Sequence, residues 1–196
     1  MNLPNKLTIL RIILAGVFMF FLFSHGVLFK SLALATFLIA SFTDFLDGYI
    51  AKKCGMITDF GKLMDPIADK ILTLSAFLAF VEMELIPAWM ALVIVFREVT
   101  VTGLRIAALN QGKVLAAEEA GKHKMVSQVV SIFVILLFII FREAGMKVFS
   151  FWSASTERVY LDAIFLLMLT TTLLTLGSGM SYLIKNKGVY FNAKTD

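Results

Sequence analysis

Residues 44–69 read DFLDGYIAKKCGMITDFGKLMDPIAD, and four aspartates of this stretch, Asp44, Asp47, Asp65 and Asp69, lie at the ends of two very apolar segments. A charged Asp at the centre of a membrane helix costs roughly 2.5 to 3.5 kcal/mol, so four of them facing lipid would cost on the order of 10 kcal/mol. We therefore expect all four carboxylates to face a cavity that holds water or metal ions.

Outside this stretch the chain is strongly apolar. Hydrophobic residues make up 59% of the 196 positions and charged residues only 16%, and the mean hydropathy is +0.87. Soluble domains contain about 25% charged residues. Several apolar runs reach the ~20 residues that cross a ~30 Å hydrocarbon core as a helix, and no ten-residue alternating pattern indicates a barrel. The composition predicts an all-α integral membrane protein, and no repeat or linker divides residues 1–196 into separate domains.

The apolar runs predict six transmembrane helices in a single bundle. Their expected bounds are 8–26, 31–52, 65–81, 88–109, 122–141 and 159–184. The third is expected to begin at Asp65, because Asp at an N-cap followed by Pro66 at the first helical position is a specific helix-start signal.

The basic residues predict the orientation of these helices. The N-terminal residues, 52–70, 105–124 and the C-terminal tail contain thirteen of the 18 Lys and Arg residues, whereas the turns on the opposite side contain four. Cytoplasmic loops are enriched in Lys and Arg. Both termini and the aspartate-rich loop are therefore expected on the cytoplasmic side.

The spacing of the four aspartates indicates a metal site. On a helix, Asp44 and Asp47 lie about 60° apart, and Asp65 and Asp69 about 40° apart, so each pair forms one carboxylate cluster. Two such clusters facing each other supply oxygen ligands for Mg²⁺ or Mn²⁺, and a pair of these ions can clamp a diphosphate. Zinc is not expected, since no His or Cys accompanies the carboxylates.

This pattern resembles the signature of the CDP-alcohol phosphotransferase family, D-x-x-D-G-x-x-A-R-x8-G-x3-D-x3-D. The positions that match with every spacing intact are Asp44, Asp47, Gly48, Ala51, Gly61, Asp65 and Asp69. Lys52 stands where the family has Arg, which keeps the positive charge but loses the bidentate fork.

Further segments extend the resemblance over the chain, toward bacterial members that use glycerol 3-phosphate. They are NLPNKLTILR at 2–11, REVTVTGLR at 97–105, GKHK at 121–124 and SGMSY at 178–182. Met125 replaces the Thr that usually follows the third segment.

The resemblance implies an enzyme of phospholipid biosynthesis that transfers the phosphatidyl group of CDP-diacylglycerol to sn-glycerol 3-phosphate and releases CMP. It implies that Asp44, Asp47, Asp65 and Asp69 bind Mg²⁺ or Mn²⁺, two ions per site, and that Asp69 is also the general base.

The donor is implied to lie with its diphosphate on the metals and its acyl chains in the bilayer. Its cytidine is placed near Gly48 and Ala51, two small residues that keep this helix surface open to a bulky substrate. Lys52 and Gly61 complete the signature around it. Asn5 and Thr8 could approach the nucleotide as well, although an N-terminal helix cap explains them almost equally.

The phosphate of the acceptor needs cations that the aspartates cannot supply. Arg105, Lys122 and Lys124 flank one predicted cytoplasmic loop, and Arg97 lies deeper in its span, so together they are the candidate phosphate pocket. Alternatively, Glu98 pairs with an Arg only to neutralise buried charge.

Two alternative functions remain open. Another member of the family could use a different acceptor, as in cardiolipin- or inositol-phosphate-type synthases, because the aspartate signature is shared. An ion or proton transporter would also need intramembrane acids, but it predicts them near mid-bilayer and gives no reason for the spacing from Gly48 to Gly61.

The remaining expectations concern partners and location. The resemblance implies a bacterial cytoplasmic-membrane enzyme that contacts membrane lipid, is a homodimer and has no nucleic-acid partner. A stripe of small residues in the last span could allow close packing within the chain or across a dimer. It consists of Gly177, Ser178, Gly179 and Ser181.

Overall fold

The computed structural model describes the backbone of residues 3–54, 59–110, 119–147 and 152–187, and the side chains of 9–43, 70–108, 121–146 and 152–187. The described part of the chain forms six helices. They are α1 (Leu3–Phe23), α2 (Val27–Cys54), α3 (Asp59–Glu82), α4 (Ala88–Asn110), α5 (Glu119–Lys147) and α6 (Ala154–Lys185). The prediction of an all-α chain with six helices is confirmed.

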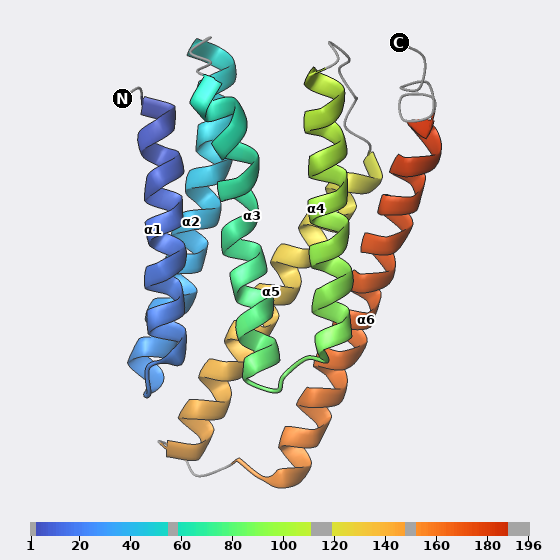
Figure 1. Ribbon diagram of the computed structural model, residues 1–196. Helices are drawn as coiled ribbons and strands as arrows, with labels where there is room; N and C mark the ends of the chain where they lie inside the picture. Colours follow the sequence, from blue (N-terminus) through green and yellow to red (C-terminus); the bar gives the residue numbers. More distant parts are fainter. Residues whose placement is uncertain (1–2, 55–58, 111–118, 148–151, 188–196) are drawn as a thin grey trace.

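The helices run alternately up and down the bundle (Figure 1). Helix α1 packs on α2 and α3, whereas α4 packs on α3 and α6. Helix α5 runs diagonally and joins the two sides, because it contacts α2, α3 and α6. The start of α1, the end of α2, the start of α3, the end of α4 and the end of α6 all lie at one end of the bundle.

The buried core combines aromatic rings with alanines. Phe18 of α1 and Phe37 of α2 lie with their ring centroids 6.0 Å apart, and both are fully buried. Ala15 and Ala33 are also buried, and small side chains of this kind let helix backbones approach closely. The rings fill the space that the alanines leave, so α1 and α2 pack closely against each other.

The outer surface of the bundle is apolar. Large hydrophobic side chains such as Phe20, Leu92 and Ile184 are exposed, and Phe96 reaches 70%. Among the described residues, Gly121–Met146 and Ala154–Lys185 are long and apolar enough to cross a membrane, and Ile9–Phe23 and Val27–Thr43 are shorter apolar helical stretches. A continuous apolar surface of this extent is typical of contact with lipid.

The start of the third helix differs from the prediction. Helix α3 begins at Asp59, so the prediction that it begins at Asp65 is wrong. Pro66 lies in the helix interior, where it removes the single hydrogen bond to the carbonyl four residues earlier, while its own φ remains helical. As a result, Asp65 and Asp69 lie on one continuous helix, and the four-residue spacing places them on the same face.

The last helix also begins earlier than expected, at Ala154 rather than near residue 159. Ser153 is its N-cap, and its Oγ accepts a hydrogen bond from the Thr156 backbone N–H at 3.2 Å. A serine cap satisfies one of the unpaired N–H groups of the first turn. Arg142 of α5 pairs with Glu157 at 2.6 Å next to this cap, which fastens α5 to α6 at the end of the bundle away from the termini.

Candidate functional site

The two aspartate pairs lie on the two helices that meet at the same end of the bundle. Asp44 and Asp47 belong to the last part of α2, and Asp65 and Asp69 belong to the first part of α3. Only residues 55–58 separate these helices, so both pairs are near the α2–α3 connection. An acid-only donor set of this kind fits a hard cation such as Mg²⁺ or Mn²⁺.

The side chains of the predicted donor and metal site lie outside the described part of the structure. Their roles stay predictions, and the structure gives only their positions on the helices. These residues are Asn5, Thr8, Asp44, Asp47, Gly48, Ala51, Lys52, Gly61, Asp65 and Asp69. Among the side chains that are described, no group of three or more His, Cys, Asp or Glu could hold a metal.

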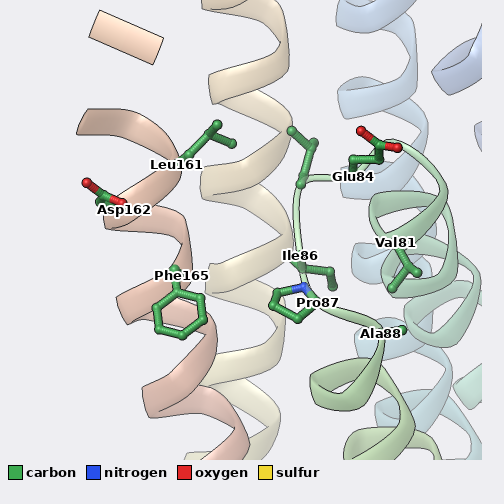
Figure 2. Close-up of a pocket in the computed structure, with 9 residues that line it drawn as sticks. Val81, Glu84, Ile86, Pro87, Ala88, Leu161, Asp162 and Phe165 are labelled. Atoms are coloured by element: carbon green, nitrogen blue, oxygen red, sulfur yellow. The ribbon is translucent and has the colours of Figure 1, made fainter. Parts of the chain in front are cut away.

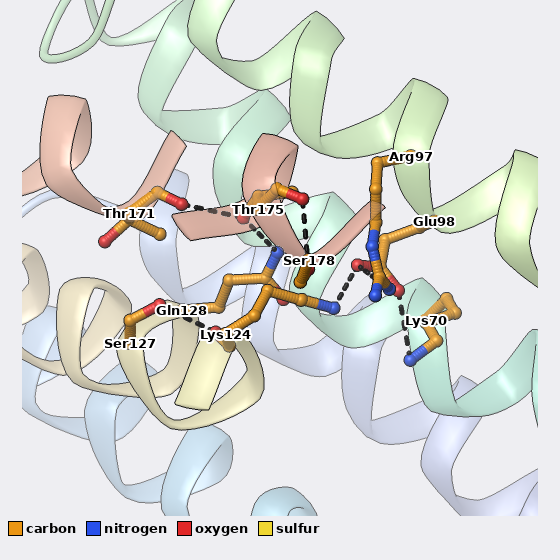
Figure 3. Close-up of polar contacts among 9 residues, drawn as sticks. All are labelled: Lys70, Arg97, Glu98, Lys124, Ser127, Gln128, Thr171, Thr175 and Ser178. Carbon is orange, nitrogen blue, oxygen red and sulfur yellow. Dashed lines mark hydrogen bonds and ion pairs between the residues drawn. The ribbon is translucent and has the colours of Figure 1, made fainter. Parts of the chain in front are cut away.

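A buried carboxylate, Glu98 of α4, lies next to this region and gathers three cations (Figure 3). Lys70 Nζ lies 3.2 Å from Glu98 Oε2, and Arg97 Nη1 lies 3.3 Å from Glu98 Oε1. Lys124 Nζ donates a hydrogen bond to the same Oε1. We call these four residues the Glu98 cluster; it joins α3, α4 and α5.

Burial makes the Glu98 cluster costly to break. The side chains of Glu98 and Lys124 are 2% and 3% exposed, whereas that of Lys70 is 30% exposed. A buried charge is tolerated only when it is paired and hydrogen-bonded. Glu98 and Lys124 therefore form the inner part of the cluster, and Lys70 lies at its accessible edge.

The structure divides the four predicted phosphate-binding residues into two groups. Arg97 and Lys124 come together on Glu98, whereas Arg105 and Lys122 are exposed. The alternative of a Glu98–Arg pair is thus present as a contact, but Lys70 and Lys124 share the same carboxylate.

A cavity of about 230 Å³ borders the Glu98 cluster. Its polar lining residues come from five helices: Arg11 of α1, Ser41 of α2, Lys70 and Thr73 of α3, Glu98 of α4 and Gln128 of α5. Lys70 directly follows Asp69 in α3. Of the Glu98 cluster, Lys70 and Glu98 therefore line the cavity, and Lys70 lies on the helix that contributes two of the predicted metal ligands.

Sequence reasoning missed Lys70 and the central position of Glu98. Lys70 follows Asp69 but lies 100° further around the helix, so its place in the sequence did not predict that it belongs to the same site. The available signal was the stripe of Lys124, Gln128 and Ser131 on α5, polar positions at helical spacing that are all buried. Buried polar residues in an apolar helix indicate contact with another polar element.

This stripe continues the polar contacts from α5 to α6. Ser131 Oγ and Thr171 Oγ1 lie 2.8 Å apart, and Gln128 Nε2 donates to Thr175 Oγ1 at 3.5 Å. Hydrogen bonds of this kind between membrane helices are worth about 0.6 to 2 kcal/mol each. They hold α5, and with it Lys124, in a fixed register against α6; Figure 3 shows the contact between Gln128 and Thr175.

The glycine stripe of α6 packs within the chain at one position. A Cβ placed on Gly179 would lie 3.0 Å from Arg97 Cγ, whereas a Cβ on Gly177 would meet nothing within 4 Å. Gly179 therefore makes room for the aliphatic part of Arg97, which leads the guanidinium toward Glu98.

We expect Gly179→Ala to be less stable than Gly177→Ala. Both changes gain helix propensity, about 1 kcal/mol at most, but only the first displaces Arg97, which we expect to cost about 1 to 2 kcal/mol. Thermal unfolding of both variants in detergent measures the difference. Equal unfolding temperatures would show that Arg97 moves away freely.

A second hollow lies at the opposite end of the bundle (Figure 2). It has a volume of about 500 Å³ and lies between the α3–α4 turn and α6. Glu84 and Asp162 reach it from separate elements, and apolar residues such as Pro87 and Phe165 form the rest. Among the described residues that line this hollow, none is a predicted site residue.

Comparison with known proteins gives a consistent assignment. The profile of the CDP-alcohol phosphatidyltransferase family matches residues 1–140. The chain is 43% identical over 148 residues to CDP-diacylglycerol–glycerol-3-phosphate 3-phosphatidyltransferase of Bacillus subtilis, covering 69% of this chain and 77% of that protein.

Two further relatives are matched over a smaller part of their length. The probable phosphatidylglycerophosphate synthase of Mycobacterium tuberculosis is 40% identical over 134 residues, 67% of this chain and 64% of that protein. The CDP-diacylglycerol–glycerol-3-phosphate 3-phosphatidyltransferase of Rickettsia typhi is 41% identical over 104 residues, 53% of this chain and 58% of that protein.

Proposed function

The chain belongs to the CDP-alcohol phosphatidyltransferase family, and from this premise we propose that it is a phosphatidylglycerophosphate synthase. It transfers the phosphatidyl group of CDP-diacylglycerol to sn-glycerol 3-phosphate, as the names of its relatives describe for them. The observation that carries the choice of acceptor is the 43% identity to the Bacillus subtilis protein, whose name gives glycerol 3-phosphate as the acceptor.

The six helices all cross the bacterial cytoplasmic membrane in this proposal. The exposed apolar surface and the two long apolar helices support it. The end of the bundle at which α2 ends and α3 begins also contains most of the basic residues in the described part of the chain. Basic residues favour the cytoplasmic side, where a water-soluble glycerol phosphate is available.

Asp44, Asp47, Asp65 and Asp69 hold the metal ions in the proposed site. When bound, two Mg²⁺ or Mn²⁺ ions neutralise the diphosphate of the donor and stabilise the departing CMP. The aspartates are suited to this because their oxygens are the ligands that these ions prefer. Helices α2 and α3 bring the two pairs to one end of the bundle.

Asp69 is the proposed general base. Its carboxylate takes the proton of the acceptor hydroxyl while that oxygen forms a bond to the β-phosphorus of CDP-diacylglycerol. The bond from this phosphorus to the oxygen bridging to the CMP moiety breaks, and CMP leaves with the electron pair. Proton removal matters because an alcohol is otherwise a weak nucleophile.

The rest of the proposed site binds and orients the two substrates. Gly48, Ala51, Lys52 and Gly61 contact the nucleotide and diphosphate of the donor. Asn5 and Thr8 at the start of α1 close the nucleotide site. The acyl chains lie in the bilayer. We also propose that two copies of the chain form a homodimer, as the family resemblance implies.

The acceptor phosphate binds to cations of α4 and α5 in this proposal. Arg97 and Lys124 already lie together on Glu98, and the exposed Arg105 and Lys122 reach the acceptor from the rim. Charge-assisted hydrogen bonds to phosphate are roughly twice as strong as neutral ones.

CMP release by the purified protein in detergent tests this function. We expect release with CDP-diacylglycerol and Mg²⁺ only when sn-glycerol 3-phosphate is present. Inositol phosphate, phosphatidylglycerol and buffer alone are the matched controls. Release with phosphatidylglycerol or inositol phosphate instead would replace the proposed acceptor, and no release with any acceptor would contradict the transferase.

A further inference from the structure

Two hydroxyl groups line the cavity of about 230 Å³ from different helices. Ser41 belongs to α2 and Thr73 to α3. Hydroxyls in apolar helices commonly donate to the carbonyl four residues earlier, as Thr36 and Thr43 of α2 do at 2.8 and 2.7 Å. Ser41 and Thr73 form no hydrogen bond within the described part of the structure. Both hydroxyls are therefore available as donors to a ligand in the cavity.

The two hydroxyls lie one helical turn deeper in the bundle than the predicted metal ligands. Ser41 precedes Asp44 by three positions on α2, and Thr73 follows Asp69 by four positions on α3. Positions three or four apart share a helix face and lie about 4.5 to 6 Å apart along the axis. Because α2 ends and α3 begins at the same end of the bundle (Figure 1), both steps lead from that end toward the middle.

The walls of the cavity fit the middle part of a lipid. Leu72, Leu74 and Val129 are apolar lining residues. Met125, which replaces the Thr usual in the family, also lines the cavity and is 49% exposed next to the exposed Val126. The cavity therefore reaches the apolar outer surface of the bundle at Met125. Its volume of about 230 Å³ is below the roughly 300 to 1,000 Å³ of pockets for drug-sized ligands, so only a segment of a lipid enters.

The charged groups of the cavity already have partners within the protein. Lys70 Nζ lies 3.2 Å from Glu98 Oε2, and Arg11 also takes part in an interaction within the chain. The amide of Gln128 donates to Thr175 at 3.5 Å. The hydroxyls of the cavity are neutral donors. They suit a neutral acceptor such as an ester carbonyl, whereas a phosphate is bound by cations.

We propose that the cavity binds the ester-linked glycerol of the lipid donor, and that Ser41 and Thr73 donate hydrogen bonds to its ester carbonyls. This inference rests on the proposed function for the identity of the donor, CDP-diacylglycerol. The two ester groups of this lipid follow its diphosphate on the side of the acyl chains. With the diphosphate at the aspartates, the esters reach the hydroxyls one turn deeper, and the chains leave past Met125 into the bilayer.

An ether analogue of the donor separates this role from general lipid binding. CDP-dialkylglycerol with chains of the same length keeps the diphosphate, the glycerol and the apolar chains, but it has no carbonyl oxygen. The loss of two hydrogen bonds should weaken binding about fivefold or more. We therefore expect the wild-type protein to bind the ester lipid more tightly than the ether lipid by this factor.

Calorimetric binding of both lipids to the full-length protein in detergent, with Mg²⁺ and without acceptor, tests the inference. We expect Ser41→Ala and Thr73→Val to bind the ester lipid about two- to tenfold more weakly and the ether lipid as the wild type does. Thr36→Val is the matched control, because the Thr36 hydroxyl of α2 donates to the Leu32 carbonyl instead. This variant should bind both lipids like the wild type.

Equal affinity of the wild-type protein for the two lipids would overturn the inference, as would the absence of binding of either lipid. Losses of equal size for the ester and the ether lipid in Ser41→Ala and Thr73→Val would also overturn it. The comparison of the two lipids on the wild-type protein needs no substitution, so it decides even if a variant does not fold.

The inference and the proposed reaction fail in different ways. Ester-selective binding that Ser41→Ala and Thr73→Val reduce, without CMP release in the presence of any acceptor, would refute the reaction and keep the ester site. CMP release that needs sn-glycerol 3-phosphate, together with equal affinity for the two lipids, would do the reverse.

Discussion

Asp69→Asn is expected to lower CMP release by about a thousandfold, since a general base contributes about 10²- to 10⁴-fold to the rate. Asn has nearly the same shape as Asp, but it cannot take a proton and is a poorer ligand for Mg²⁺. The loss should persist at saturating substrate and Mg²⁺, because it affects the chemical step. Initial rates of CMP release in detergent measure it.

Asp59→Asn is the matched control for this substitution. Asp59 is the first residue of α3 and lies ten positions before Asp69 on the same helix. It is absent from the aspartate signature, so we expect Asp59→Asn to retain wild-type activity. Activity near the wild-type level in Asp69→Asn would show that another group takes the proton. Equal losses in both variants would point to a general effect on α3.

Helix number and order could be predicted because apolar length and polar turns determine them. The errors concern helix starts. Asp65 and Pro66 form a helix-start signal, yet α3 begins at Asp59. A local start signal does not prevent the residues before it from forming further helical turns. Ser153 was not predicted as a helix cap. A transmembrane span is recognised by its run of apolar residues, so a polar first turn before that run is not counted as part of the helix.

The candidate site was predictable only where it is local in sequence. The aspartate pairs follow from helical spacing, and they lie on α2 and α3 as expected. The Glu98 cluster depends on how α3, α4 and α5 pack, and 26 residues separate Glu98 from Lys124. No spacing rule links such positions. A buried acid could be recognised in the sequence, but its partners could not be chosen from several candidate cations.

The predicted metal ligands and the Glu98 cluster lie on two different sets of helices that share α3. The acids of the predicted metal site belong to α2 and α3, whereas the Glu98 cluster draws its cations from α3, α4 and α5. Helix α3 takes part in both, through the neighbouring residues Asp69 and Lys70. A shift of α3 along its axis would therefore move Asp69, the proposed base, and Lys70 together.

Removal of divalent metal is the second large effect that we expect. Chelation with excess EDTA should reduce CMP release by about a thousandfold or more, because the loss of cation stabilisation at a transferring phosphoryl group costs several kcal/mol. Added Mg²⁺ or Mn²⁺ should restore it. Ca²⁺ should not, since it prefers longer bonds and more ligands than Mg²⁺. Full turnover in excess chelator would contradict the proposed metal site.

Two variants connect this requirement to the separate parts of the site. Asp44→Asn removes a proposed ligand and should raise the Mg²⁺ concentration needed for half-maximal activity. Arg105→Ala should leave that concentration unchanged while it raises the KM for sn-glycerol 3-phosphate, because the exposed Arg105 is proposed to bind the acceptor phosphate and not the metal. If both variants shifted both quantities equally, the acids and the acceptor cations would form one coupled network.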